Sequence, residues 1–128
     1  MPDAGWGKPN ATVLVVEDTE PIRKMVCAML TQKGYSCLEA ADGFEALRLM
    51  EERDGVHLVL TDMMMPKMGG VELAQRLALT RPGVRILFMS GYAEDPQLSG
   101  VFLSKPFTAT SLMEKVREVL HRPGASLP

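Results

Sequence analysis

Residues 57–66 read HLVLTDMMMP, an apolar run that ends in Asp62 and is followed by three methionines and a proline. A run of this length indicates a buried strand, and a carboxylate at its carboxyl end is costly to bury without partners. Candidate partners follow three other apolar runs of the chain: Glu17 and Asp18 after 13–16, Ser90 after 86–89, and Lys105 after 101–104. If these runs are neighbouring parallel strands, three carboxylates, one hydroxyl and one ammonium converge on one crevice.

Amphipathic stretches separate the apolar runs. We expect strands near 12–16, 35–40, 57–61, 84–89 and 101–104, with apolar residues at helical spacing between them. Turn and cap residues bound these helices: Pro21 in a first turn, Gly34 after a last turn, the Asp42/Glu45 capping box, Gly69-Gly70, the Pro82-Gly83 stop and Thr108 as the last N-cap. Strands that alternate with helices indicate βαβ units, and therefore an α/β fold with a parallel sheet buried on both faces.

Composition and charge restrict the classes of function. The chain has 128 residues, 46% of them hydrophobic and 23% charged, with a formal net charge of −2, which suits one globular domain. The small net charge and scattered basic residues predict no direct nucleic-acid binding. No apolar stretch reaches the roughly 20 residues of a membrane span, so we expect no membrane insertion. Two cysteines without a C-x-x-C pair or disulfide framework, and no signal-peptide pattern, predict a reduced, cytoplasmic domain. We expect residues 1–10 and 122–128 to be tails.

Four motifs occur in order along the chain: VLVV with Glu17-Asp18, LVLT-Asp62-MMMP with Gly70, Ser90-Gly91-Tyr92, and Lys105-Pro106-Phe107. Together they resemble the receiver (phosphoacceptor) domain of two-component response regulators, over residues 11–121. The resemblance implies a flavodoxin-like, doubly wound five-stranded parallel sheet in the order 2-1-3-4-5, with helices on both faces. It also implies a phosphorelay signalling domain that is not itself an enzyme, although it catalyses its own phosphoryl transfer and slow dephosphorylation.

The resemblance assigns chemistry to the residues of the crevice. Asp62 is the implied phosphoacceptor, which takes its phosphoryl group from the phosphohistidine of a histidine kinase or histidine phosphotransfer protein. Oxygen groups are implied to hold Mg²⁺, for which Mn²⁺ can substitute: the carboxylates of Asp18 and Asp62, the backbone carbonyl of Met64 and, through a water, Glu17. Donors are implied to bind the phosphoryl oxygens: Lys105, Ser90 and the backbone N–H groups of Met63 and Gly91.

The chain differs from the usual pattern of this family at several positions. Met64 and Tyr92 flank the path of an attacking water, so we expect slow spontaneous dephosphorylation. Phe102 occupies the aromatic switch position, and its rotation is expected to report phosphorylation without a phenolic hydrogen bond. The segment 94–100 is short, which predicts that the fourth helix of the family fold, before the last strand, is short or absent. This segment resembles receivers of hybrid sensor histidine kinases, and it argues against the usual dimer face, so we expect a monomer or a weak dimer.

Other classes of protein fit the sequence less well. A haloacid-dehalogenase phosphatase needs a second aspartate where Met64 stands, and a P-loop or dinucleotide-binding protein needs a glycine-rich turn after the first strand. The remaining alternative is a degenerate receiver that acts only as a phosphorylation-independent docking module. Such a module normally loses acidic, aspartyl or lysine positions that are all present here. Partner choice is expected to rest on exposed residues of the first helix such as Arg23.

Overall fold

The computed structural model describes residues 11–91 and 102–121, and strands and helices alternate along the first of these ranges. The strands within these residues are β1 (Thr12–Val16), β2 (Ser36–Ala40), β3 (Val56–Asp62), β4 (Arg85–Ser90) and β5 (Phe102–Ser104). The helices are α1 (Glu20–Gln32), α2 (Gly43–Glu52), α3 (Gly70–Thr80) and α4 (Ala109–His121). Each strand predicted from the sequence is present, with ends that differ by at most one residue.

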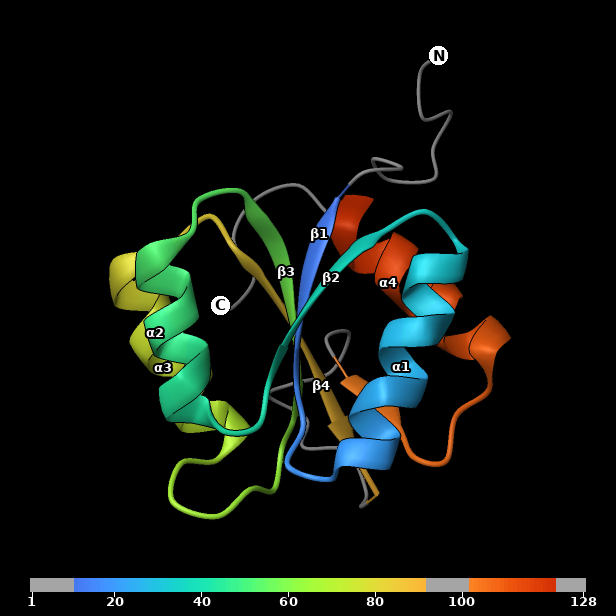
Figure 1. Ribbon diagram of the computed structural model, residues 1–128, viewed down its shortest axis with the longest axis horizontal. Coiled ribbons are helices and arrows are strands. Elements are labelled where there is room, and N and C mark those ends of the chain that lie inside the picture. The colour runs from blue at the N-terminus through green and yellow to red at the C-terminus, as the bar shows by residue number, and fades with distance from the viewer. Residues whose placement is uncertain (1–10, 92–101, 122–128) are drawn as a thin grey trace.

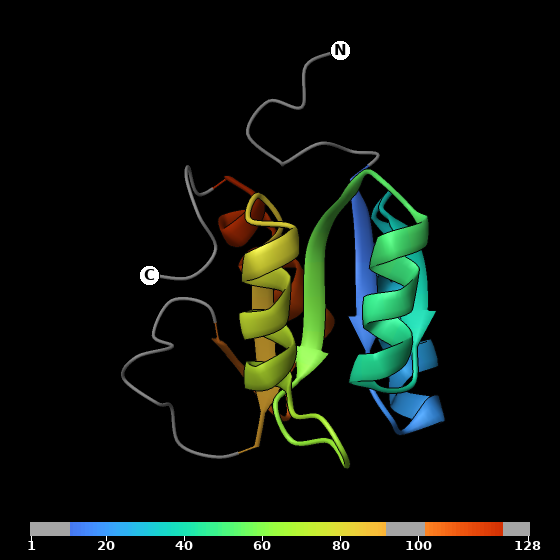
Figure 2. The same cartoon turned by 90° about the vertical axis from the view of Figure 1, so that its left-hand side faces the viewer.

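The strands form one parallel sheet in the order β2-β1-β3-β4-β5. Helices α2 and α3 cover one face of the sheet, and α1 and α4 cover the other (Figures 1 and 2). The predicted flavodoxin-like, doubly wound fold is therefore confirmed. The chain winds in opposite directions from β1 and from β3, so the two strands flank the switch point at which such folds place their ligands.

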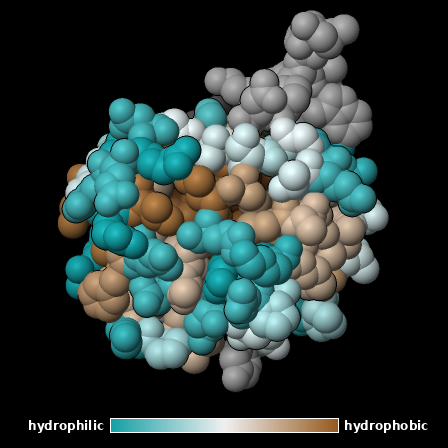
Figure 3. Space-filling model, viewed as in Figure 1, coloured by the Kyte–Doolittle hydropathy of each residue, from teal (hydrophilic) through white to brown (hydrophobic). Residues whose placement is uncertain are grey.

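Alternate side chains of the central strands fill two hydrophobic cores, one on each face of the sheet. Leu14 and Val16 belong to the core under α2 and α3, whereas Val13 and Val15 belong to the core under α1 and α4. All four are fully buried, as expected for a parallel strand covered on both faces. On the face drawn in Figure 3, hydrophilic residues are interspersed with hydrophobic ones, the most hydrophobic area lying to the upper left of centre.

The predicted N-cap residues of α2 and α4 form the expected hydrogen bonds. Asp42 is the N-cap of α2, and its side chain accepts the Glu45 N–H at 2.8 Å. The Glu45 carboxylate in turn accepts the N–H of Ala41 at 2.7 Å, one residue before the cap. Thr108 precedes α4 and its hydroxyl accepts the Ser111 N–H at 3.0 Å. These bonds satisfy N–H groups that the first turn of a helix leaves without partners.

Gly70, the first residue of α3, brings this helix against the end of β3. A Cβ atom at position 70 would lie 2.6 Å from the carbonyl oxygen of Asp62 and 3.1 Å from the Cα of Met63. Both atoms belong to the backbone, so neither can swing aside. The Gly70 N–H donates to the Met63 carbonyl at 3.0 Å and closes the loop between β3 and α3. Glycine is required here because the backbone approaches so closely.

Several expectations fall outside the described residues. These are the two tails, Tyr92, and the short segment 94–100 with its short or absent helix. The two cysteines are free: Cys27 of α1 is buried and Cys37 of β2 is half-buried. No described helix combines the length and the apolar character needed to cross a bilayer.

Candidate functional site

Three carboxylates meet at the carboxyl edge of the sheet. Glu17 and Asp18 follow β1, Asp62 ends β3, and one oxygen atom from each lies within 4.8 Å of the others. Glu17 is 1% exposed and Asp62 8% exposed, whereas Asp18 is exposed to solvent. The sequence predicted this convergence, and the strand order β1-β3 produces it because the two strands are hydrogen-bonded neighbours.

Lys105, which follows the edge strand β5, supplies a positive charge to the cluster. Its Nζ lies 3.4 Å from Glu17 Oε1 and 3.4 Å from Asp62 Oδ2. The backbone N–H of Lys105 donates to the Ser90 carbonyl at 2.7 Å, which fixes the start of its loop at the end of β4. With all three acids ionised, one ammonium leaves the cluster with two negative charges in excess.

Glu17 is held at both its backbone and its side chain. Its N–H donates to the Ala40 carbonyl at 3.1 Å, and its Oε2 accepts the Thr19 N–H at 3.2 Å. Burial raises the pKa of the Glu17 carboxyl above its ordinary value, against the lowering effect of the Thr19 N–H, and the charge of Asp62 adds to the rise. A buried carboxylate whose ionised form is disfavoured gains most from an added cation.

The loop after β3 presents one backbone N–H group to the Asp62 carboxylate. The Met64 N–H donates to Asp62 Oδ1 at 3.3 Å, but the Met63 N–H donates to the Met89 carbonyl at 2.9 Å. The sequence assigned the Met63 N–H to the phosphoryl group; in this structure that N–H is used within the sheet, and the Met64 N–H is the one that donates to Asp62. The Met64 side chain is 63% exposed beside the site.

The remaining predicted residues lie on β4 and β5. Ser90 ends β4 and is 1% exposed, one residue beyond the Asp62–Met89 pair of the sheet register. Gly91 follows it. Phe102 is 5% exposed and pairs in register with Phe88, within the core under α2 and α3. The Phe102 side chain, for which the sequence predicted a switch role, therefore lies inward in this structure.

The sequence analysis did not predict the ion pair between Arg23 and Glu39. Arg23 was expected to be an exposed, partner-selecting residue, but only 13% of its side chain is exposed and it forms an ion pair with Glu39 at 2.9 Å. The position of Glu39 on β2 could have indicated this pair. Glu39 alternates with Leu38 on β2, so its side chain emerges on the face that α1 covers. A charge on a covered face needs a partner, and α1 offers Arg23.

The donor set of the cluster fits a hard divalent cation. The three acidic residues all offer carboxylate oxygens, two of the residues are buried, and the two negative charges left after pairing with Lys105 equal the charge of one such ion in size. Mg²⁺ prefers oxygen ligands, holds only one or two carboxylates directly and keeps several waters. The exposure of Asp18 leaves one side of the cluster open for such waters.

Comparisons with known proteins identify the family. The family described as the response regulator receiver domain matches residues 13–117. The sensor kinase CckA of Brucella abortus (strain 2308) is 40% identical over 121 residues, which are 88% of this chain and 13% of CckA. The response regulator receiver protein CpdR of the same strain is 30% identical over 115 residues, which are 84% of this chain and 95% of CpdR.

Solved structures agree with this result. The crystal structure of the receiver domain from the hybrid histidine kinase CckA has a TM-score of 0.76 and 35% sequence identity, and covers 87% of this chain and 100% of that one. A response regulator receiver domain protein from Clostridium thermocellum has a TM-score of 0.79 and 26% identity, and covers 88% of this chain and 95% of that one. This chain therefore belongs to the response regulator receiver domain family, the signalling domains of two-component phosphorelays.

Proposed function

We propose that Asp62 accepts a phosphoryl group from the phosphohistidine of a histidine kinase or histidine phosphotransfer protein, in a reaction that depends on Mg²⁺. The observation that carries this proposal is the convergence of Asp62 with Glu17, Asp18 and Lys105 at one edge of the sheet. Glu17, Asp18, Asp62 and the Met64 carbonyl would hold the ion. When bound, Mg²⁺ supplies positive charge that offsets repulsion between carboxylates and phosphoryl oxygens.

The residues of the chain position the donor and neutralise charge. A carboxylate oxygen of Asp62 attacks the phosphorus atom, the P–N bond to the donor imidazole breaks, and the imidazole leaves with the bonding electron pair. Lys105 pairs with Asp62 in this structure and can turn toward a phosphoryl oxygen once Asp62 carries the phosphoryl group. The Ser90 hydroxyl and the backbone N–H groups of Met64 and Gly91 complete the set of donors. Phosphoryl transfer needs mainly such positioning.

Phosphorylation is proposed to act through Phe102 and to last long. Phe102 is inward here, and an outward rotation after Ser90 shifts toward the phosphoryl group would change the surface of β5. Met64, which is exposed, and Tyr92, which follows Gly91 in the sequence, are proposed to keep an attacking water from the acyl phosphate. A Mg²⁺ or Mn²⁺ ion would serve both the forward transfer and this slow hydrolysis.

The parent architecture is proposed from the relatives. The 40% identity with the sensor kinase CckA supports a receiver from a hybrid histidine kinase, and coverage of 95% of CpdR supports a stand-alone regulator of similar size. We favour the hybrid kinase, because the segment 94–100 resembles that group in sequence. The parent chain would then be an enzyme, although this domain is a phosphoacceptor.

The proposal is tested by incubating the chain with Mg²⁺ and acetyl phosphate and measuring its intact mass. We expect a single phosphoryl adduct that is absent from Asp62→Ala and absent when EDTA removes the metal. Asp54→Ala is the matched control, since the Asp54 side chain is 95% exposed and precedes the start of β3, at the opposite end of the strand from Asp62. It should keep the adduct.

The opposite result would favour the alternative function. A folded wild-type chain that takes no phosphoryl group from acetyl phosphate, phosphoramidate or a phosphorylated histidine kinase is a docking module. An adduct that persists in Asp62→Ala would move the phosphoacceptor to another residue.

A further inference from the structure

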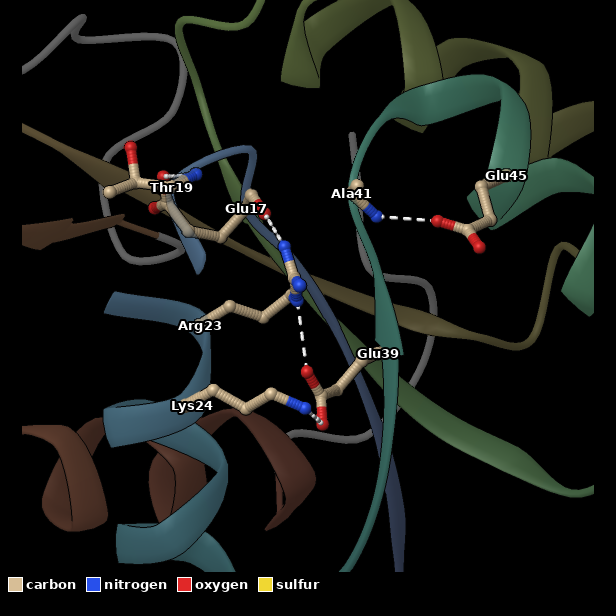
Figure 4. Close-up of polar contacts among 7 residues, drawn as sticks. All are labelled: Glu17, Thr19, Arg23, Lys24, Glu39, Ala41 and Glu45. Atoms are coloured by element: carbon tan, nitrogen blue, oxygen red, sulfur yellow. Dashed lines mark hydrogen bonds and ion pairs between the residues drawn. The ribbon is translucent and has the colours of Figure 1, made fainter. Parts of the chain in front are cut away.

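Arg23 of α1 joins the loop after β1 to the strand β2 (Figure 4). One guanidinium nitrogen, Nη1, donates to the backbone carbonyl of Glu17 at 2.9 Å, and Nε donates to Glu39 Oε1 at 2.9 Å. Only 13% of the Arg23 side chain is exposed. In this largely buried position, Arg23 therefore uses two of its donors to bind the Glu17 carbonyl and the Glu39 carboxylate.

The carbonyl that Arg23 binds belongs to the peptide unit that connects Glu17 to Asp18. Because a peptide unit is planar, fixing its oxygen also fixes the direction of the Asp18 N–H and Cα. The structure gives Glu17 further anchors, at Ala40, Thr19 and Lys105. No side-chain hydrogen bond of Asp18 is present among the described residues, so its placement toward Asp62 depends on this backbone.

Glu39 holds Arg23 and balances its charge. Its Oε1 accepts from Arg23 and its Oε2 accepts from Lys24 Nζ at 3.0 Å. The two hydrogen bonds lower the pKa of the Glu39 carboxyl, so it stays ionised. An unbalanced guanidinium this close to a cation site would repel the cation, and the Glu39 carboxylate removes much of that repulsion.

We propose that Arg23, held by Glu39, is a positioning residue for the metal site: it fixes the Glu17–Asp18 peptide so that both carboxylates face Asp62. The proposal rests on the proposed function, because it assumes that this cluster binds Mg²⁺. Partners behind metal ligands typically change metal affinity by about 10-fold to 100-fold when they are removed.

The experiment measures Mg²⁺ affinity by isothermal titration of the unphosphorylated chain, without any phosphodonor. Arg23→Met should weaken Mg²⁺ binding by roughly 10-fold, the lower end of that range. If the charge of Arg23 alone mattered, the same variant would bind Mg²⁺ more tightly, because a nearby positive charge is gone. The sign of the change therefore separates positioning from electrostatics.

Lys24→Met is the matched control, because it also removes one positive charge next to Glu39. Lys24 does not contact Glu17, and its side chain is 57% exposed. We expect its Mg²⁺ affinity to stay within about 2-fold of wild type, as for an exposed ion pair. Arg23→Lys keeps the charge but lacks the fork that reaches two acceptors, so it should also weaken binding, by less than Arg23→Met.

Glu39→Gln tests the proposal even if Arg23→Met fails to fold. It should weaken Mg²⁺ binding, and in the Arg23→Met background it should add nothing further, since Glu39 acts through Arg23. A folded Arg23→Met chain with wild-type or tighter Mg²⁺ affinity overturns the proposal, as do independent effects of the two substitutions. If wild type itself binds no Mg²⁺ and takes no phosphoryl group, the proposed function fails instead.

Discussion

The loops after β1 and β3 both carry acidic residues to the same edge of the sheet, but they are built differently. The loop after β1 is tied down by Arg23, Ala40 and the Thr19 N–H, and its Glu17 side chain is 1% exposed. The loop after β3 is held near its start by the Met63 N–H on the Met89 carbonyl and near its end by the buried Met68, whereas Met64 between them is 63% exposed.

The difference matches two tasks. A metal site needs carboxylates that are already in place, because any movement on binding costs affinity. A phosphoacceptor must admit a donor histidine from another protein, so its loop needs an open surface. The first loop is thus suited to hold the ion and the second to meet the partner. Substitutions in one loop at a time separate these two tasks.

Gly70→Ala should damage the second loop most. Its Cβ would lie 2.6 Å from the Asp62 carbonyl oxygen, so α3 must move away from β3. We expect the free energy of unfolding to fall by about 1–3 kcal/mol, as for other overpacked sites. Urea unfolding measures this. Gly83→Ala is the control, since a Cβ there would meet no atom within 4 Å, and equal losses in both variants would contradict the close approach at Gly70.

Glu17→Gln should separate stability from metal binding in the first loop. The folded-state pKa of Glu17 is raised by burial. A raised pKa means that stability is fully present below the unfolded-state value, near 4.5, and is lost as the pH rises through the folded-state value. Without Mg²⁺, Glu17→Gln should therefore be more stable than wild type at pH 7, and this advantage should vanish toward pH 4.

Thermal unfolding in EDTA across this pH range checks the sign. With saturating Mg²⁺ the order should reverse, because the wild type gains stability from binding by mass action. Asp18→Asn is the matched variant. Its side chain is exposed, so metal-free stability should change by less than about 0.5 kcal/mol. A metal-free Glu17→Gln chain that is less stable than wild type at pH 7 would refute the burial argument.

Met64→Asn should have the smallest effect on folding, because the side chain is mostly exposed. We expect the free energy of unfolding to stay within about 0.5 kcal/mol of wild type. The lifetime of the acyl phosphate should shorten several-fold, since a polar side chain can orient the attacking water. Tyr92→Glu is expected to act in the same direction. The decay of the phosphoryl adduct, followed by intact mass, measures both, and unchanged lifetimes would refute the shielding role.

Much of this protein was predictable from short-range signals. The alternation of apolar runs and helical spacing predicted the strands, and Asp42 and Thr108 predicted their helix starts, because caps act within four residues. Met63 shows the limit of such short-range signals. Its N–H is used by the Met89 carbonyl of the neighbouring strand, 26 residues away in sequence, and no local pattern reports which partner a backbone group will find.

By itself, the sequence determined the order of the elements and the polar residues at the ends of four of the strands, because both can be read from periodicity along the chain. Only the tertiary structure decided how those residues are held. Arg23 reads as an exposed helix residue in the sequence, but the crossing of α1 over β2 buries it between Glu39 and the Glu17 carbonyl. Such a pair spans 16 residues of chain, and its contact depends on how the layers pack. Packing is a property of the whole fold.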